Sequence, residues 1–180
     1  MPPKAPAAAD VSFMQGMIMH HAQAVEMTGL LRSRSKDPAM QALGKRMSIS
    51  QTDEIEFMKQ WLEDRGAPVS MPTEHDMAHM DHSDPKAMAA MNHAAAMPLM
   101  PGMLTPQQME VLAKASGPAF DHLFLTGMIQ HHTGALVMVE DLFDTPGAGE
   151  ESVLYDFATD IDNTQSAEIK IMRDMLKERP

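Results

Sequence analysis

The sequence contains no cysteine among its 180 residues. Disulfide bonds and thiolate metal sites are therefore excluded, so any soft ligand in this protein must be a thioether. Aromatic residues are also few, with six Phe, one Trp and one Tyr, whereas methionine occurs 21 times. A core of ordinary composition, built from Leu, Ile, Val and Phe, does not need this many methionines. The excess indicates a use for sulfur beyond packing.

Positive charge is scarce as well, because 14 Lys and Arg face 25 Asp and Glu and leave a formal net charge of −11. Such a surface repels nucleic acid and anionic lipid and attracts cations, so we expect no nucleic-acid partner. No apolar run approaches the roughly 18 residues of a spanning helix, so we expect no membrane insertion. The first residues, MPPKAPAAAD, lack the apolar stretch of a secretory signal. We expect either a cytosolic protein or an exported one whose signal peptide is absent from this sequence.

The chain contains an internal duplication. At an offset of 111 residues, nine of the 18 positions from Asp10 to Met27 are identical to their counterparts in the second half. The identical pairs are Asp10 and Asp121, Phe13 and Phe124, Gly16 and Gly127, Met17 and Met128, Ile18 and Ile129, His20 and His131, His21 and His132, Ala24 and Ala135, and Met27 and Met138. A later pattern repeats at an offset of 114: Gln51, Glu54, Ile55, Met58 and Leu62 match Gln165, Glu168, Ile169, Met172 and Leu176. The change in offset falls in a turn, so each half is predicted to be a helical hairpin.

Start and stop signals predict helices over residues 10–31 and 38–65 in the first half, and over 118–143 and 150–177 in the second. Asp10 is predicted as the N-cap of the first helix, and Asp37 followed by Pro38 begins the second. Four such long helices favour an all-α bundle. We predict one globular domain overall, made of a disordered segment 1–9, a first hairpin 10–66, a Met/His-rich connection 67–117 and a second hairpin 118–180. Short helices are predicted in the connection over residues 85–97 and 106–115.

Folding each hairpin at its turn brings a pair of adjacent histidines level with a Gln-x-x-Glu pair. In the first hairpin these residues are His20, His21, Gln51 and Glu54, and in the second they are His131, His132, Gln165 and Glu168. Gln51 and Glu54 share a stripe with Met47, Met58 and Trp61, whose spacing is typical of a buried helix face. Four histidines and two carboxylates are therefore expected in one central layer of the core.

Two interpretations of this layer remain open. The side chains could form a self-sufficient network, in which each Glu accepts a hydrogen bond from a His and the Gln residues close the remainder. Alternatively the histidines bind metal, and Gln51, Glu54, Gln165 and Glu168 orient them without touching the ion. We favour the second interpretation because the whole arrangement is duplicated.

The methionines indicate which metal to expect. Imidazole suits several transition metals, but thioether sulfur favours Cu(I) and its soft analogue Ag(I). Copper is therefore the expected metal, with Cu(I) preferred, Cu(II) as a second form and Ag(I) as a mimic. The candidate ligands on the duplicated helices are Met14, Met17, His20, His21, Met27, Met128, His131, His132 and Met138. Methionine without cysteine also fits an oxidising compartment, where thioethers survive better than thiols.

The connection contains a second candidate site, TEHDMAHMDH. Its histidines His75, His79 and His82 are spaced by four and three residues, and Met77 and Met80 alternate with them. This pattern predicts a flexible copper site that is weaker than the central layer, because ordering the segment costs entropy. A polar linker in which the histidines are incidental is the alternative.

The motifs GMIMHHAQAVEM and GMIQHHTGALVMVEDL, with MPGMLTPQQMEVL before the second copy, resemble the family catalogued as domain of unknown function 305. The partner helices QTDEIEFMKQWL and NTQSAEIKIMRDML extend the resemblance over about residues 10 to 178. It implies a ferritin-like four-helix bundle, usually exported, in a family with members linked to copper binding and copper tolerance. The motif residues carried over by position are Met17, His20, His21, Met128, His131 and His132.

The sequence therefore predicts an exported, periplasmic or secreted protein that sequesters or carries Cu(I) or Cu(II) without catalytic turnover. Other copper-handling proteins are its expected partners, and its oligomeric state is left open. A ferritin-like, metal-dependent oxidase is the main alternative, although the Glu-x-x-His pattern of di-iron bundles is missing. A third alternative is a helical interaction module whose methionines form an adaptable surface.

Overall fold

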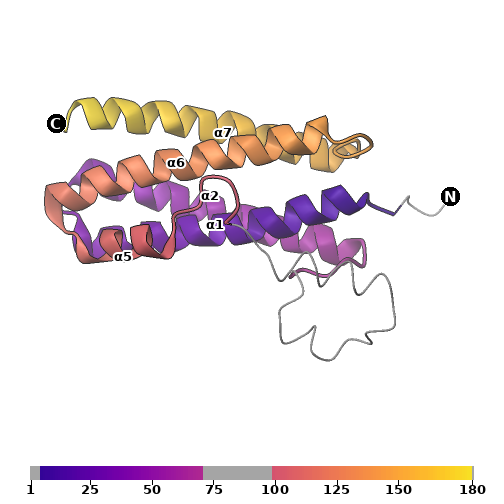
Figure 1. The fold of residues 1–180 in the computed structure, drawn as a ribbon, viewed down its shortest axis with the longest axis horizontal. Coiled ribbons are helices and arrows are strands. Elements are labelled where there is room, and N and C mark those ends of the chain that lie inside the picture. Colours follow the sequence, from indigo (N-terminus) through magenta and orange to yellow (C-terminus); the bar gives the residue numbers. More distant parts are fainter. Residues whose placement is uncertain (1–4, 71–98, 180) are drawn as a thin grey trace.

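The computed structural model describes residues 5–70 and 99–179, which form five α-helices and no strand (Figure 1). The helices are α1 (Ala8–Arg34), α2 (Pro38–Asp64), α5 (Pro106–Lys114), α6 (Gly117–Asp144) and α7 (Ser152–Lys177). The four long helices pair as two antiparallel hairpins, α1 with α2 and α6 with α7, and the hairpins meet where α1 packs against α6. The predicted all-α four-helix bundle of two hairpins is confirmed.

The two hairpins are joined by a crossover. The C-terminal end of α2 lies at the same end of the bundle as the N-terminal end of α1. In contrast, α5 and the start of α6 lie at the opposite end (Figure 1). The predicted short helix over 106–115 is α5, whose N-cap Thr105 accepts a hydrogen bond from the Gln108 N–H at 3.1 Å. The other predicted short helix, over 85–97, lies outside the described residues.

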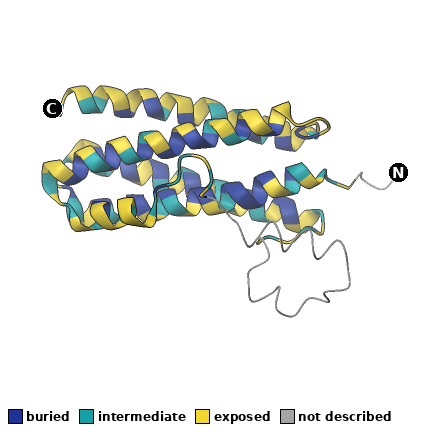
Figure 2. Ribbon diagram, viewed as in Figure 1, coloured by how far each residue is buried: buried dark blue, intermediate teal, exposed yellow. Residues whose placement is uncertain are grey.

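Two apolar clusters fill the bundle, one at each end, and Figure 2 shows the buried faces of the helices turned toward each other. The first cluster surrounds Trp61 and Ile161, and the second surrounds Phe120 and Phe124. Buried methionines belong to both: Met14, Met17 and Met58 to the first, and Met27, Met40, Met47, Met128 and Met172 to the second. Among the helices described, none combines the length and the apolar character that crossing a membrane requires.

The prediction of Asp10 as an N-cap is wrong in position, although the residue does serve the helix start. α1 begins two residues earlier, at Ala8, so Asp10 stands within the first turn. Its Oδ2 accepts a hydrogen bond from the Ala7 N–H at 3.3 Å, and its Oδ1 accepts one from the Gly149 N–H at 2.7 Å. The buried carboxylate therefore ties the start of α1 to the turn between α6 and α7.

The duplicate of Asp10 lacks both of these donors. Asp121 is 6% exposed, close to the 4% of Asp10, but within the described ranges its Oδ1 has no hydrogen-bond partner. The counterpart of Ala7 is Pro118, which has no N–H to donate. The turn between α1 and α2 is also shorter than the turn between α6 and α7, so it offers no equivalent of Gly149.

This difference predicts unequal costs for two matched substitutions. Asp10→Ala leaves the buried Gly149 N–H without a partner and is expected to lower the free energy of unfolding by about 1–3 kcal/mol. Asp121→Ala removes a carboxylate whose Oδ1 is unpaired, so its cost is expected to be smaller. Urea unfolding of the two variants checks the order, and equal destabilisation would contradict it.

Candidate metal centre

A buried polar layer separates the two apolar clusters at the middle of the bundle. The layer consists of His20, His21, Gln51, His131, His132 and Gln165, each at most 2% exposed. Burying this many polar groups is expensive unless each finds a partner. Their contacts therefore indicate what the layer is built to do.

Two of the histidines contact carboxylates on the other helix of their own hairpin. His21 Nε2 lies 2.5 Å from Glu54 Oε2, and His132 Nε2 lies 2.6 Å from Glu168 Oε2. An ionised carboxylate can only accept, so each Nε2 donates an N–H. The Glu54 side chain is 21% exposed and that of Glu168 16%, so both carboxylates keep contact with solvent. The histidine pairs therefore lie level with the glutamates, as the sequence predicts.

The other two histidines donate to backbone carbonyls. His20 Nε2 lies 2.9 Å from the Pro101 oxygen, and His131 Nε2 lies 2.8 Å from the His20 oxygen. A carbonyl oxygen also only accepts, so Nε2 carries the hydrogen in both rings. The two rings face each other across the contact between α1 and α6, with centroids 3.8 Å apart and planes inclined by 36°.

Burial keeps these two facing rings neutral. It lowers the pKa of His20 from 6.5 to about 4, against the raising effect of the hydrogen bond to Pro101 and with the help of nearby His21 and His132. Burial likewise holds the pKa of His131 well below 6.5, and the neighbouring histidines lower it further. A neutral imidazole with its hydrogen on Nε2 presents a lone pair on Nδ1, which is the form that binds metal.

The Nδ1 atom of each of the four histidines is buried and has no hydrogen-bond partner in the described part of the chain. Gln51 Oε1 and both polar side-chain atoms of Gln165 are unpartnered too, so seven of the nine such atoms in residues 5–70 and 99–179 lie in this layer. Native interiors contain few unpartnered polar groups, and each needs an explanation. The self-sufficient network is therefore incomplete: the glutamates accept bonds from histidines, but the glutamines do not close the remainder.

The arrangement matches the way that proteins hold metal-binding histidines. Such histidines donate one ring N–H to a carboxylate or a backbone carbonyl, which fixes the tautomer and leaves the other nitrogen for the metal. In this layer, His21 and His132 donate to carboxylates while His20 and His131 donate to carbonyls. Four oriented nitrogen lone pairs therefore remain in the core.

The candidate methionines flank this layer. Met14, Met17, Met27 and Met128 are 0% exposed and belong to the apolar clusters on its two sides, whereas Met138 is half-buried. Within the described part of the chain, no three His, Asp or Glu side chains are placed to hold one metal ion. A site here would therefore combine imidazole nitrogen with thioether sulfur, which is a soft ligand set.

The strap, residues 99–105, holds Pro101 against His20. Gln23 fixes it through two hydrogen bonds to Leu104, from its Nε2 to the carbonyl at 3.0 Å and from the backbone N–H to its Oε1 at 2.8 Å. Gly102 takes a φ of 75°, and a Cβ on Gly134 would collide with Pro101. The sequence analysis missed this acceptor for His20, although two glycines placed for close approach were a usable signal.

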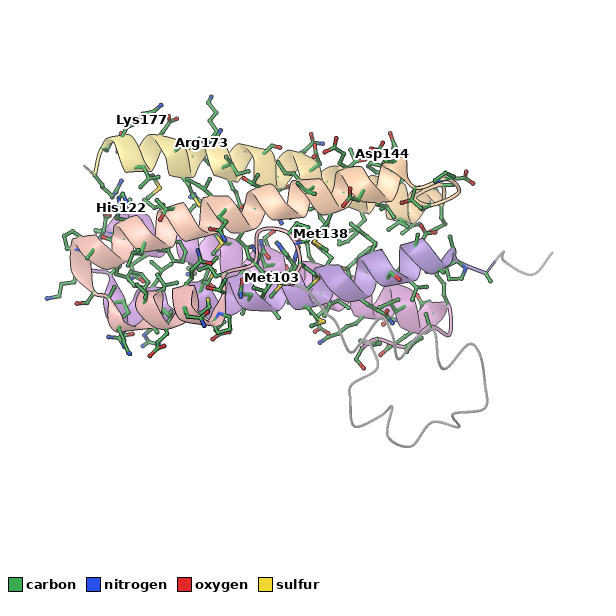
Figure 3. The ribbon with its side chains drawn as sticks, in the orientation of Figure 1. Met103, His122, Met138, Asp144, Arg173 and Lys177 are labelled. Atoms are coloured by element: carbon green, nitrogen blue, oxygen red, sulfur yellow. The ribbon has the colours of Figure 1, made fainter. Side chains whose placement is uncertain are left out.

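The second copper site stays a prediction, because its candidate ligands fall outside the described residues: His75, Met77, His79, Met80 and His82. His122 lies near the start of α6, at the end of the bundle, while Met138 and the strap residue Met103 lie near its middle (Figure 3). His122 therefore offers an off-site histidine for comparison.

Comparison with known proteins points to one family. The model of the family described as Domain of unknown function (DUF305) matches residues 10–176. A DUF305 protein from Streptomyces coelicolor that is inferred to be secreted has a TM-score of 0.75 at 29% identity, with 95% of this chain and 93% of that chain covered. A DUF305 fragment from Deinococcus radiodurans has a TM-score of 0.75 at 24% identity, with coverage of 97% and 99%, and is alike in fold.

A further structural neighbour is CopM, solved in a Cu(I)-bound form. Its TM-score is 0.66 at 26% identity, with 94% of this chain and 96% of that chain covered. CopM is also solved with Cu(II), with Ag and in an apo form. A curated relative, an uncharacterized protein of Acanthamoeba polyphaga mimivirus, is 38% identical over 56 residues, which are 31% of this chain and 37% of that protein. The chain thus spans little more than a third of that relative.

Proposed function

Because this chain belongs to the family described as Domain of unknown function (DUF305), we propose that it is a copper-binding protein that sequesters or carries the ion through His and Met ligands. CopM, which has the same fold, holds Cu(I), Cu(II) and Ag. The Streptomyces coelicolor protein inferred to be secreted has this fold as well. Export to the periplasm or the medium, a part in copper tolerance and exchange with other copper-handling proteins belong to the proposal.

One observation carries it: four buried histidines each donate an N–H from Nε2, and the Nδ1 of each has no partner among the described residues. In a purely structural layer these nitrogens would lose their hydrogen bonds to water on folding and gain nothing in return. Ligation to copper would give such a nitrogen a partner, because a neutral imidazole nitrogen is a good ligand for this metal.

The methionine sulfurs around the layer favour one oxidation state of the bound copper. The apolar clusters on both sides of the layer contain fully buried methionines. Thioethers favour Cu(I) over harder ions, and a dry core disfavours an ion of higher charge. Cu(I) is therefore the preferred form in the layer, with Ag(I) as its mimic and Cu(II) as the weaker binder.

Metal titration tests the proposal. Cu(I) added under reducing conditions, in competition with a chromophoric chelator, is expected to be taken up, and Ag(I) is expected to compete for the same site. X-ray absorption at the copper edge is expected to show both nitrogen and sulfur neighbours. A protein that takes up neither ion would sink the proposal and favour the interaction module. Oxygen consumption above free-metal controls would instead favour an oxidase.

A further inference from the structure

Two methionine side chains converge on Gly16, a buried glycine of α1. A Cβ placed on Gly16 would lie 3.2 Å from Met100 Sδ and 3.5 Å from Met138 Cε. The first distance is tighter than an ordinary contact, so the missing side chain of Gly16 is what lets both methionines reach the helix backbone. Met100 comes from the strap and Met138 from α6, which means that only the folded bundle brings these thioethers together.

The duplication supplies an internal control for this niche. At the counterpart, Gly127, a Cβ would lie 3.2 Å from Leu104 Cδ2 and 3.5 Å from Met27 Cε. Met27 is the duplicate of Met138, but a leucine takes the place of Met100. At Gly127 a branched aliphatic side chain, that of Leu104, fills the space beside the glycine. Packing alone therefore does not require the sulfur of Met100 at Gly16.

The two niches also differ in exposure. Met27 is 0% and Leu104 3% exposed, whereas Met100 and Met138 are only half-buried. Beside Met138 is a shallow groove of about 260 Å³, whose lining includes Pro101, Met138 and the exposed residue Asp141. Solvent therefore reaches part of each methionine residue, and the carboxylate of Asp141 attracts cations toward Met138.

The Gly16 niche adjoins the histidine layer. Gly16 precedes His20 by one helical turn, roughly 6 Å along the axis of α1. Met100 is followed directly by Pro101, whose carbonyl accepts the hydrogen bond from His20 at 2.9 Å. The half-buried methionine pair therefore lies beside the buried imidazole of His20.

We propose that Met100 and Met138 form an entry site for Cu(I), which hands the ion to the histidine layer. This inference rests on the proposed copper-binding function. The transfer is ligand exchange: thioether bonds to the ion break as bonds to imidazole nitrogen form, and copper stays Cu(I) throughout. Two neutral sulfur ligands hold a soft ion loosely enough to release it to the layer.

Uptake kinetics test the entry site. The variant Met100→Leu is expected to slow Cu(I) uptake from a chelator by about ten-fold, while the equilibrium affinity of the layer stays the same, because Met100 is not among the candidate ligands of the layer. The matched control is Met109→Leu, which changes a half-buried methionine packed on the second apolar cluster. Equal uptake rates in the two variants would overturn the inference. No uptake by the wild type would instead reject the proposed function.

A second measurement observes the site directly. In protein labelled with ¹³C at the methionine methyl groups, Ag(I) added beyond the amount that fills the histidine layer is expected to shift the Met100 and Met138 signals and leave those of Met109 and Met175 in place. The same shifts are expected in a folded His20→Ala/His21→Ala variant, because the entry site does not use these rings. Unmoved Met100 and Met138 signals in a protein that does bind Ag(I) would contradict the entry site alone.

Discussion

Replacing His20 and His21 together by alanine is expected to weaken the tightest Cu(I) site by more than about 100-fold, because changing residues that merely orient a ligand already costs 10–100-fold. The variant removes two of the four unpartnered Nδ1 atoms and the ring that faces His131. Competition titration against a chromophoric Cu(I) chelator measures the loss. Circular dichroism of the metal-free variant verifies that the bundle still forms.

A milder variant keeps this prediction testable if the double replacement fails to fold. Glu54→Gln preserves the size of a side chain that is 21% exposed but removes the charge that orients His21. It is expected to weaken binding by about 10–100-fold. His122→Ala is the matched control, because His122 is exposed and lies away from the layer, and it is expected to leave the affinity unchanged. Unaltered affinity and stoichiometry in a folded His20→Ala/His21→Ala protein would reject the layer as the tight site.

The metal-free protein is expected to lose about 3 kcal/mol of unfolding free energy from His20 alone as the pH falls from 7 to 4, since each unit of pKa difference is worth about 1.4 kcal/mol. The pKa of His20 is lowered by burial from 6.5 to about 4. Between these two values the unfolded chain binds a proton that the folded chain does not bind, so acid favours unfolding. His131 acts in the same direction because burial lowers its pKa as well.

Urea unfolding at a series of pH values measures this loss. Carboxylates whose pKa is lowered in the folded protein, such as Asp37 beside Arg179, affect the unfolding free energy only near and below the ordinary carboxyl pKa of about 4. The window from pH 6.5 to 4.5 therefore isolates the histidines. A His20→Gln variant is expected to show a flatter dependence in this window. A wild-type stability that does not change across it would show that the layer opens to solvent and protonates freely.

Local signals were enough to predict much of the fold. The repeated spacing and the Asp37–Pro38 start predicted the long helices within a few residues of their observed ends, and the short helix predicted over 106–115 matches α5. The sequence also predicted that His21 and Glu54 lie at the same height along the first hairpin, because both residues are near the middle of helices of similar length joined by a short turn. The ferritin-like assignment and the domain boundaries stay predictions.

Other contacts had no local signal because they join residues far apart in the chain. Asp10 looked like an N-cap, but its second partner is Gly149, 139 residues away. The hydrogen bond from His20 to Pro101 spans 81 residues and depends on how the crossover lies against α1. Only the folded chain could show that Asp10 and Asp121 differ in their partners despite equivalent positions.

The stretch from Met17 to Met27 and its duplicate determined by themselves which side chains occupy the middle of the bundle, because helical periodicity fixes the face and duplication fixes the level. What the ring nitrogens contact was decided by tertiary structure. Carboxylates and carbonyls from other elements accept from the Nε2 of each of the four layer histidines, and no group among the described residues forms a hydrogen bond with their Nδ1 atoms. The physical reason is that hydrogen bonding depends on positions in space, which the packing of α1 against α6 and of the strap against both helices sets.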